Sequence, residues 1–178
     1  MAFTVELPQS LDELDQKVGV EAREGRELES VLDRYLLEVE RAADADIRTS
    51  VLLLDREQGR LFHGAAPSLP KAYCDAIDGL LIGPSAGSCG TAAYAGHAIF
   101  VTDIVTDALW DDFRELAALH DLRSCWSTPI RSGEEIIGTF AIYHSTARAP
   151  TESEIYSVKA ISEYVARAIV RCGDVATI

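Results

Sequence analysis

The sequence predicts an α+β protein in which helices at both chain ends cover an antiparallel sheet of five or so strands. Apolar residues recur every three or four positions near both termini, which is the period of an amphipathic helix. The middle of the chain instead holds short runs rich in β-branched and aromatic residues, bounded by turn residues. Because tight turns join several of these runs, we expect neighbouring strands to be antiparallel.

Composition indicates one soluble globular domain. The chain has 178 residues, of which 48% are hydrophobic and 25% charged. Its 16 Lys and Arg residues against 29 Asp and Glu residues give a formal charge of −13, which disfavours nucleic acid and anionic membrane surfaces as partners. No apolar run is long enough to span a membrane, and residues 1–10 lack the core of a signal peptide, so we expect a cytoplasmic protein.

The two ends of the chain carry the helical pattern. We expect helices over residues 10–18 and 26–44, and a longer one that starts with a capping box formed by Thr151 and Glu154. The C-terminal helix carries a heptad-like seam of apolar residues, which we expect to join a homodimer's helical bundle. The seam consists of Val158, Ile161, Val165, Ala168 and Cys172.

The region between these helices changes to the period of strands. The turn at residues 55–59 and the Ser132–Gly133 pair predict two hairpins. The expected strands are 49–54, 60–64, 97–102, 125–130 and 135–144, and the expected short helices are 69–77, 88–95 and 111–120.

The four cysteines are spread widely through the chain. No C-x-x-C pair occurs among Cys74, Cys89, Cys125 and Cys172, which argues against a disulfide framework and against a structural metal site. Each is expected to be a single thiol, and a small buried hydrophobe is the simplest role for any one of them.

Four segments in order carry a family resemblance. They are GSCGTAAYAG (87–96), VTDIVTDALW (101–110), LRSCWSTPI (122–130) and IIGTFAIYH (136–144). Together they resemble a GAF domain over about residues 27–170, most of all the input GAF domains of sensor histidine kinases and cyclic-di-GMP signalling proteins. The resemblance implies a PAS-related fold, with a five- to six-stranded antiparallel sheet, terminal helices on one face and a ligand-pocket insertion on the other. The expected organisation is a helical extension (1–25), the domain itself (26–173) and a short tail (174–178).

The expected pocket lies between the sheet and the insertion at residues 81–120. Ser88 is expected to cap a helix that Gly96 ends, leaving backbone amides at its start free to face a ligand. Arg114 is the best candidate cation for an anionic ligand, and strand alternation allows only one of two neighbours, Cys125 or Trp126, to face the pocket. The candidate ligand-binding residues are Cys89, Gly90, Thr91, Asp103, Trp110, Arg114, His120, Cys125, Trp126 and Tyr143.

Known cofactors of GAF relatives fit this sequence poorly. Bilin attachment is disfavoured because residues 106–120 contain no cysteine, and haem is disfavoured although His120 is the best placed of the four histidines. The Asn-Lys-Phe signature of the cyclic-nucleotide-binding relatives is absent. The ligand is therefore expected to be an unidentified small organic molecule.

A regulatory role is favoured over an enzymatic one, and two alternatives stay open. Free methionine-(R)-sulfoxide reductases are GAF domains with a cysteine at the position of Cys89, but their further cysteines match nothing between residues 106 and 120, leaving Cys125 as the one conceivable resolving thiol. The other alternative is a dimerisation module whose pocket is filled by Trp110, Phe113 and Trp126. We expect either a stand-alone GAF protein that acts on a partner, such as a kinase or cyclase effector, or an input module excised from a longer protein.

Overall fold

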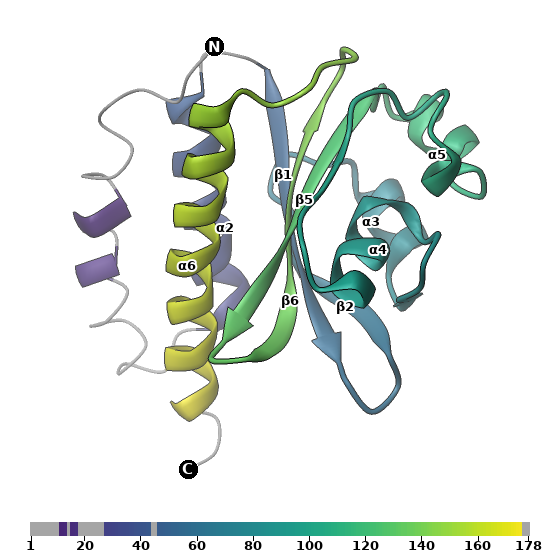
Figure 1. Cartoon of the computed structure of the whole chain (residues 1–178). Helices are drawn as coiled ribbons and strands as arrows, with labels where there is room; N and C mark the ends of the chain where they lie inside the picture. The colour runs from purple at the N-terminus through teal and green to yellow at the C-terminus, as the bar shows by residue number, and fades with distance from the viewer. Residues whose placement is uncertain (1–10, 14, 18–26, 44–45, 176–178) are drawn as a thin grey trace.

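A computed structural model describes residues 11–13, 15–17, 27–43 and 46–175. It has three layers, with two helices on one side, a sheet in the middle and short helices on the other side (Figure 1). The α+β prediction is confirmed. The expected domain boundary at residues 25–26 and parts of the expected helix over residues 10–18 lie outside the described residues.

The sheet has six antiparallel strands in the order β3-β2-β1-β6-β5-β4. Both predicted hairpins, β1–β2 and β5–β6, are confirmed. The shortest strand, β3, was missed because a two-residue strand leaves no periodicity to detect. The strands are β1 (Ile47–Asp55), β2 (Arg60–Ala65), β3 (Leu80–Leu81), β4 (Ile99–Val101), β5 (Ser124–Ser132) and β6 (Glu135–His144).

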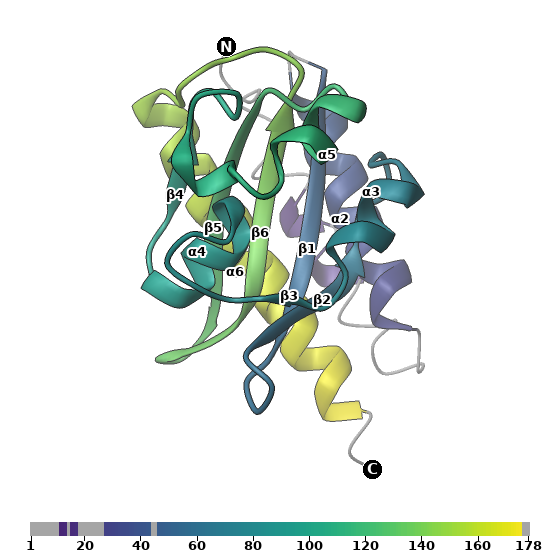
Figure 2. The same cartoon turned by 90° about the vertical axis from the view of Figure 1, so that its right-hand side faces the viewer.

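Two long helices, α2 (Leu28–Ala42) and α6 (Glu152–Val175), cover one face of the sheet. Their apolar stripes pack with Trp126, Phe140 and Ile142 in a single core. The heptad-like seam of α6 is thus largely buried within the chain, against the sheet and α2. Short helical segments cover the opposite face (Figure 2). They are α3 (Lys71–Ile77), α4 (Gly87–Ala95), the 3-10 turn η1 (Ala108–Trp110) and α5 (Arg114–Leu119).

Helical residues within 11–17 pack against the helical layer. Leu11 is 1% exposed and belongs to the same core as α2 and α6. The Asp15 carboxylate accepts hydrogen bonds from the Tyr35 hydroxyl at 3.0 Å and from Arg171 at 2.8 Å. Burial and the neighbouring Asp15 raise the pKa of Tyr35. This contact connects the beginning of the chain to both terminal helices.

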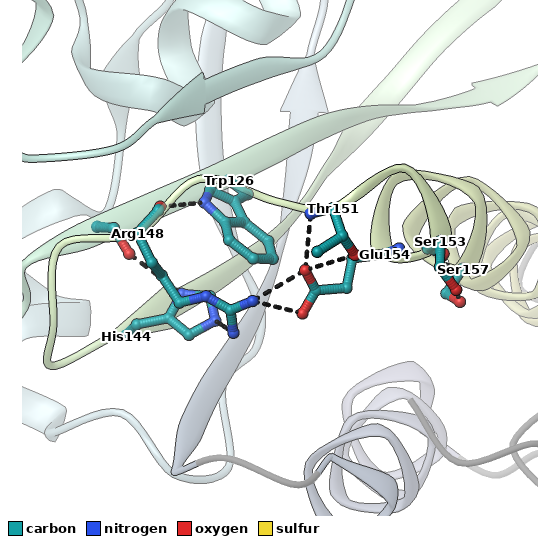
Figure 3. A network of polar contacts seen from close by, with 8 residues as sticks. Trp126, His144, Arg148, Thr151, Ser153, Glu154 and Ser157 are labelled. Atoms are coloured by element: carbon teal, nitrogen blue, oxygen red, sulfur yellow. Dashed lines mark hydrogen bonds and ion pairs between the residues drawn. The ribbon is translucent and has the colours of Figure 1, made fainter. Parts of the chain in front are cut away.

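A half-buried ion pair joins the end of the sheet to α6 (Figure 3). Arg148 donates two hydrogen bonds to Glu154, at 2.7 and 2.9 Å, and its guanidinium lies 4.8 Å from the Trp126 ring centroid. The Trp126 indole N–H donates back to the Arg148 carbonyl at 3.1 Å. Glu154 also accepts from the Thr151 N–H, and the Thr151 hydroxyl accepts from the Glu154 N–H, so the predicted capping box is confirmed.

The burial of His144 at the end of β6 is expected to make the stability of the protein depend on pH. His144 is 4% exposed, and burial, followed by the neighbouring Arg148, lowers its pKa to about 4, although Glu154 opposes the shift. An unfolded histidine has a pKa of 6.5, so between pH 6.5 and 4 the unfolded chain binds a proton that the folded chain does not. We expect His144 to cost up to about 3 kcal/mol of stability as the pH falls through this window.

Urea unfolding from pH 7.5 to 4.5 measures this loss. His144→Gln should flatten the pH dependence, and His97→Gln, at a surface position, should keep the slope of the unmodified protein. An unchanged slope in His144→Gln would assign the effect to other groups.

Candidate functional site

Helix α4 begins under the short helices that cover the sheet. Gly87 has a φ of 61°, and a Cβ there would lie 3.8 Å from the Trp110 and Phe113 rings, so both rings lie directly over the start of α4. The two rings meet edge to face, with centroids 6.4 Å apart. We call residues 104–120, which include η1 and α5, the lid.

The expected capping role of Ser88 is wrong. Ser88 lies inside α4, and its hydroxyl donates to the Cys125 carbonyl of β5 at 3.1 Å instead of capping the helix. The Trp110 indole N–H donates to the same hydroxyl at 3.0 Å. One serine thus connects the helix, the sheet and the lid, because its side chain points towards the sheet.

The amides at the start of α4 are only partly available to a ligand. The Gly90 N–H donates to the Ala86 carbonyl at 3.1 Å, and the Thr91 hydroxyl accepts from the Ala86 N–H at 3.1 Å. Both residues therefore hold the preceding loop in place. The predicted helix end is confirmed, since Gly96 is left-handed with a φ of 74°.

A cavity of about 20 Å³ lies between the sheet, α4 and the lid. This volume holds about one water molecule. The described residues that line it are apolar or carry hydroxyl, thiol or indole groups, and none is charged. They are Leu52, Tyr73, Ile77, Leu80, Ala86, Gly87, Ser88, Cys89, Trp110, Phe113 and Tyr143.

Beside this cavity, small polar side chains from β5 and β6 surround the Cys89 thiol. Cys125 pairs with Tyr143 across the two strands, and strand alternation puts Ser127 and Thr139 on the same face. The Cys89 sulfur lies 3.8 Å from the Tyr143 hydroxyl oxygen. We call Cys89, Cys125, Ser127, Thr139 and Tyr143 the thiol cluster.

Neutral polar side chains around Cys89 lower the pKa of its thiol. The Cys125 thiol is the largest cause of the shift, and the Ser127, Tyr143 and Thr139 hydroxyls add to it. Together they outweigh burial and lower the Cys89 pKa to about 7. The Ser127 and Thr139 oxygens are buried and have no hydrogen-bond partner of normal geometry in the described part of the chain. Burial raises the pKa of Cys125 and of Tyr143 well above their usual ranges, so these groups stay protonated.

The packing of the layers shows which of the two neighbours on β5 faces the cavity side. Cys125 does, whereas Trp126 lies in the core on the opposite face and so does not line the cavity. Its expected pocket role is therefore wrong for geometric reasons. Trp126 therefore cannot help to fill the pocket, whereas Trp110 and Phe113, the other two residues of the filled-pocket alternative, do line the small cavity.

Three of the ten expected ligand residues line the cavity and seven do not. Those that line it are Cys89, Trp110 and Tyr143, and those that do not are Gly90, Thr91, Asp103, Arg114, His120, Cys125 and Trp126. Asp103 accepts hydrogen bonds from Arg123 at 2.7 and 2.9 Å, and this contact lowers its pKa to about 2. Arg114 donates to Asp111 and to the Ile104 and Asp107 carbonyls, so its charge holds the lid together. His120 ends α5, with its ring 5.8 Å from the Tyr73 ring centroid.

Sequence reasoning missed Ser127, Thr139 and Tyr73. The first two are small polar residues at alternate positions of β5 and β6, and that alternation was the available signal. Tyr73 is 2% exposed and comes from α3, whose position over the sheet no local pattern indicates. Among the described residues, no group of three or more His, Cys, Asp or Glu side chains is arranged to hold a metal ion. In the same part of the chain, no helix combines the length and apolar character needed to cross a membrane.

The sheet, the helical layer and the lid define a lidded α+β sandwich. A family model for GAF domains matches residues 25–170, and the chain belongs to that family. A curated relative, the methyl sulfide methyltransferase-associated sensor of Methanosarcina acetivorans, is 43% identical over 111 residues. That match covers 62% of this chain, which spans about a tenth (11%) of the relative's length.

Two solved structures share the fold at low identity. A domain described as part of a two-component sensor histidine kinase from Sinorhizobium meliloti has a TM-score of 0.70 at 22% identity, covering 85% of this chain and 96% of its own. Free methionine-R-sulfoxide reductase from Neisseria meningitidis, solved with its substrate, has a TM-score of 0.67 at 14% identity, covering 92% and 90%. At these identities the likeness concerns the fold alone.

Proposed function

We propose that the chain is a sensory GAF domain that binds a small, mainly apolar molecule carrying one hydrogen-bonding group. The lining of the cavity beneath the lid carries this proposal, because it combines apolar walls with the hydroxyls of Ser88, Tyr73 and Tyr143 and has no charged side chain. Family membership and the sensor that matches at 43% identity support the sensory role. An anionic ligand bound by Arg114 is not proposed, since that guanidinium bonds within the lid.

Ligand entry requires the lid to move. A cavity of about 20 Å³ cannot hold an organic molecule, so the proposed ligand selects a more open arrangement of Trp110 and Phe113. The bond from the Trp110 indole to Ser88 and the edge-to-face contact with Phe113 hold the closed arrangement. Ligand contacts that replace them would supply the difference in affinity between the two states.

Strand β5 offers a short route from the lid to the helical layer. Ser88 binds the Cys125 carbonyl on one face, and the next residue, Trp126, binds Arg148 on the other. Arg148 in turn holds Glu154 in the first turn of α6. We propose that lid movement changes the position of α6 and so signals to a kinase or cyclase effector. The proposed homodimer would use the outer side of the helical layer, where Tyr156 is 78% exposed.

Native mass spectrometry of the purified protein tests ligand and dimer together. We expect a dimer that carries a small-molecule adduct, which denaturing conditions release. Leu80→Trp should abolish the adduct because Leu80 lines the cavity, whereas Leu81→Trp, its exposed neighbour on β3, should keep it. Unmodified protein without an adduct, or an equal adduct in both variants, would overturn the binding proposal. A monomer at tens of micromolar would overturn the dimer.

A thiol reductase is the second candidate, favoured by the lowered pKa of Cys89. The Neisseria protein of the same fold is a free methionine-R-sulfoxide reductase, which is the activity to test. Consumption of free methionine sulfoxide with a dithiol reductant, lost in Cys89→Ser, would support it. No turnover above the rate of the Cys89→Ser variant would reject it.

A further inference from the structure

The thiol cluster contains two buried cysteines in neighbouring elements. Ser88, the residue before Cys89, donates to the carbonyl of Cys125, so the backbones of α4 and β5 lie side by side at this point. Both cysteines belong to the core beneath the lid, and both are free. Cys74 and Cys172, by contrast, are half-buried in α3 and α6.

The two thiols differ in access and in charge stabilisation. Cys89 lines the cavity and is 6% exposed, whereas Cys125 is 0% exposed and does not line it. The Tyr143 hydroxyl lies 3.8 Å from the Cys89 sulfur, and the polar surroundings lower the Cys89 pKa, whereas burial raises the Cys125 pKa and keeps that thiol protonated. The unpartnered Ser127 and Thr139 hydroxyls, both in residues that are 0% exposed, are explained if they stabilise negative charge on Cys89.

We propose that Cys89 and Cys125 form a peroxide-reactive dithiol site, in which Cys89 is the attacking thiolate and Cys125 the resolving thiol. The reactant is hydrogen peroxide or a similarly small hydroperoxide, because the cavity beside Cys89 admits little more than a water-sized molecule. Oxidation by peroxide would be a second signal, separate from binding of the proposed ligand, and it does not require that ligand.

The reaction proceeds in two balanced steps. With hydrogen peroxide, the Cys89 sulfur attacks one oxygen and the O–O bond breaks, which leaves a sulfenic acid on Cys89. The other oxygen leaves as hydroxide and becomes water by taking the proton that the Cys89 thiol released on ionisation. An alkyl hydroperoxide would release the alcohol in place of this water. The Tyr143 hydroxyl, 3.8 Å from the sulfur, is placed to hydrogen-bond to these oxygens. The Cys125 sulfur then attacks the Cys89 sulfur, the S–O bond breaks, and the hydroxyl takes the Cys125 proton and leaves as water. Two thiols and one peroxide become one disulfide and two waters.

Intact-mass analysis after thiol alkylation tests this assignment. In a Cys74→Ser/Cys172→Ser background, hydrogen peroxide should yield a monomer with two unalkylated cysteines and a peptide joining residues 89 and 125. Dithiothreitol should reverse the change. Adding Cys125→Ser should stop the reaction at a sulfenic acid trapped by dimedone, and adding Cys89→Ser should abolish it. The same experiment with methionine sulfoxide in place of peroxide separates the two candidates. A reductase would form the 89–125 disulfide with methionine sulfoxide, whereas the proposed site should form it only with peroxide.

Two measurements keep the test independent of the fold of the cysteine variants. Peptide mapping of peroxide-treated unmodified protein should find the same 89–125 link. Thr139→Val should slow oxidation several-fold near neutral pH, because a smaller fraction of Cys89 is then ionised. At pH 9 the oxidation rate should return to that of the unmodified protein, because Cys89 is ionised with or without the Thr139 hydroxyl. The proposal would be overturned if Cys89 and Cys125 formed disulfides only between molecules. It would also be overturned if they oxidised no faster than Cys74, or stayed reduced, in the unmodified protein.

Discussion

Glu154→Ala is expected to lower the free energy of unfolding by about 2 to 3 kcal/mol, less than the loss for a fully buried ion pair because water still reaches Arg148. Glu154 is 4% exposed and holds both the Arg148 guanidinium and the Thr151 N–H. Its removal leaves Arg148, whose side chain is 21% exposed, without its carboxylate and removes half of the capping box. Burial alone would raise the Glu154 pKa, but the hydrogen bonds from Thr151 and Arg148 outweigh it and lower that pKa.

Equilibrium urea unfolding followed by circular dichroism measures the effect. Glu152→Ala is the matched control, because Glu152 is an exposed acid in the same first turn of α6 and should change stability by less than about 0.5 kcal/mol. Glu154→Ala should also alter the environment of Trp126, which packs on Arg148. Equal stability losses in the two variants would show that any negative charge near the start of α6 stabilises the protein, and that the Arg148–Glu154 ion pair adds nothing further.

The sequence predicted correctly most features that depend on residues close together in the chain. The capping box at Thr151, the left-handed Gly96 and both hairpin turns depend on residues within a few positions of one another, and all are confirmed. The expected role of Ser88 failed although it is also a local pattern. The carbonyl of Cys125, 37 residues away, and the Trp110 indole were better partners for its hydroxyl than its own helix.

The candidate site depended on information that the sequence carries only in part. Alternation along β5 required Cys125 and Trp126 to face opposite sides, but the side facing the lid followed only from the packed layers. Arg114 was the best candidate in the sequence for binding an anionic ligand, but its guanidinium bonds to Asp107 and Asp111 within the lid. The thiol cluster needs the register of β5 against β6 and the position of α4 over both, which are tertiary properties.

Gly138→Ala should be among the most destabilising single-methyl additions in the sheet, with a loss of about 3 kcal/mol, the upper part of the range for overpacking. Gly138 lies in β6 between β1 and β5, where it pairs with Leu53 and Ile130. A Cβ there would lie 2.2 Å from the Leu52 carbonyl oxygen and 3.3 Å from its carbon. These are backbone atoms of a central strand, so relief requires β1 and β6 to separate.

A graded series of glycine replacements gives this prediction its control. A Cβ at Gly64 would lie 2.9 Å from the Val51 carbonyl oxygen, and one at Gly173 would meet nothing within 4 Å. Urea unfolding should therefore give a lower free energy of unfolding for Gly138→Ala than for Gly64→Ala. Gly173→Ala should leave this free energy unchanged or raise it by up to about 1 kcal/mol, since alanine favours a helix over glycine. A loss in Gly138→Ala no larger than that in Gly64→Ala would show that β1 can move away from β6. Because β1 bears Leu52 on the cavity wall, that mobility would also give the lid side of the sheet a means of opening.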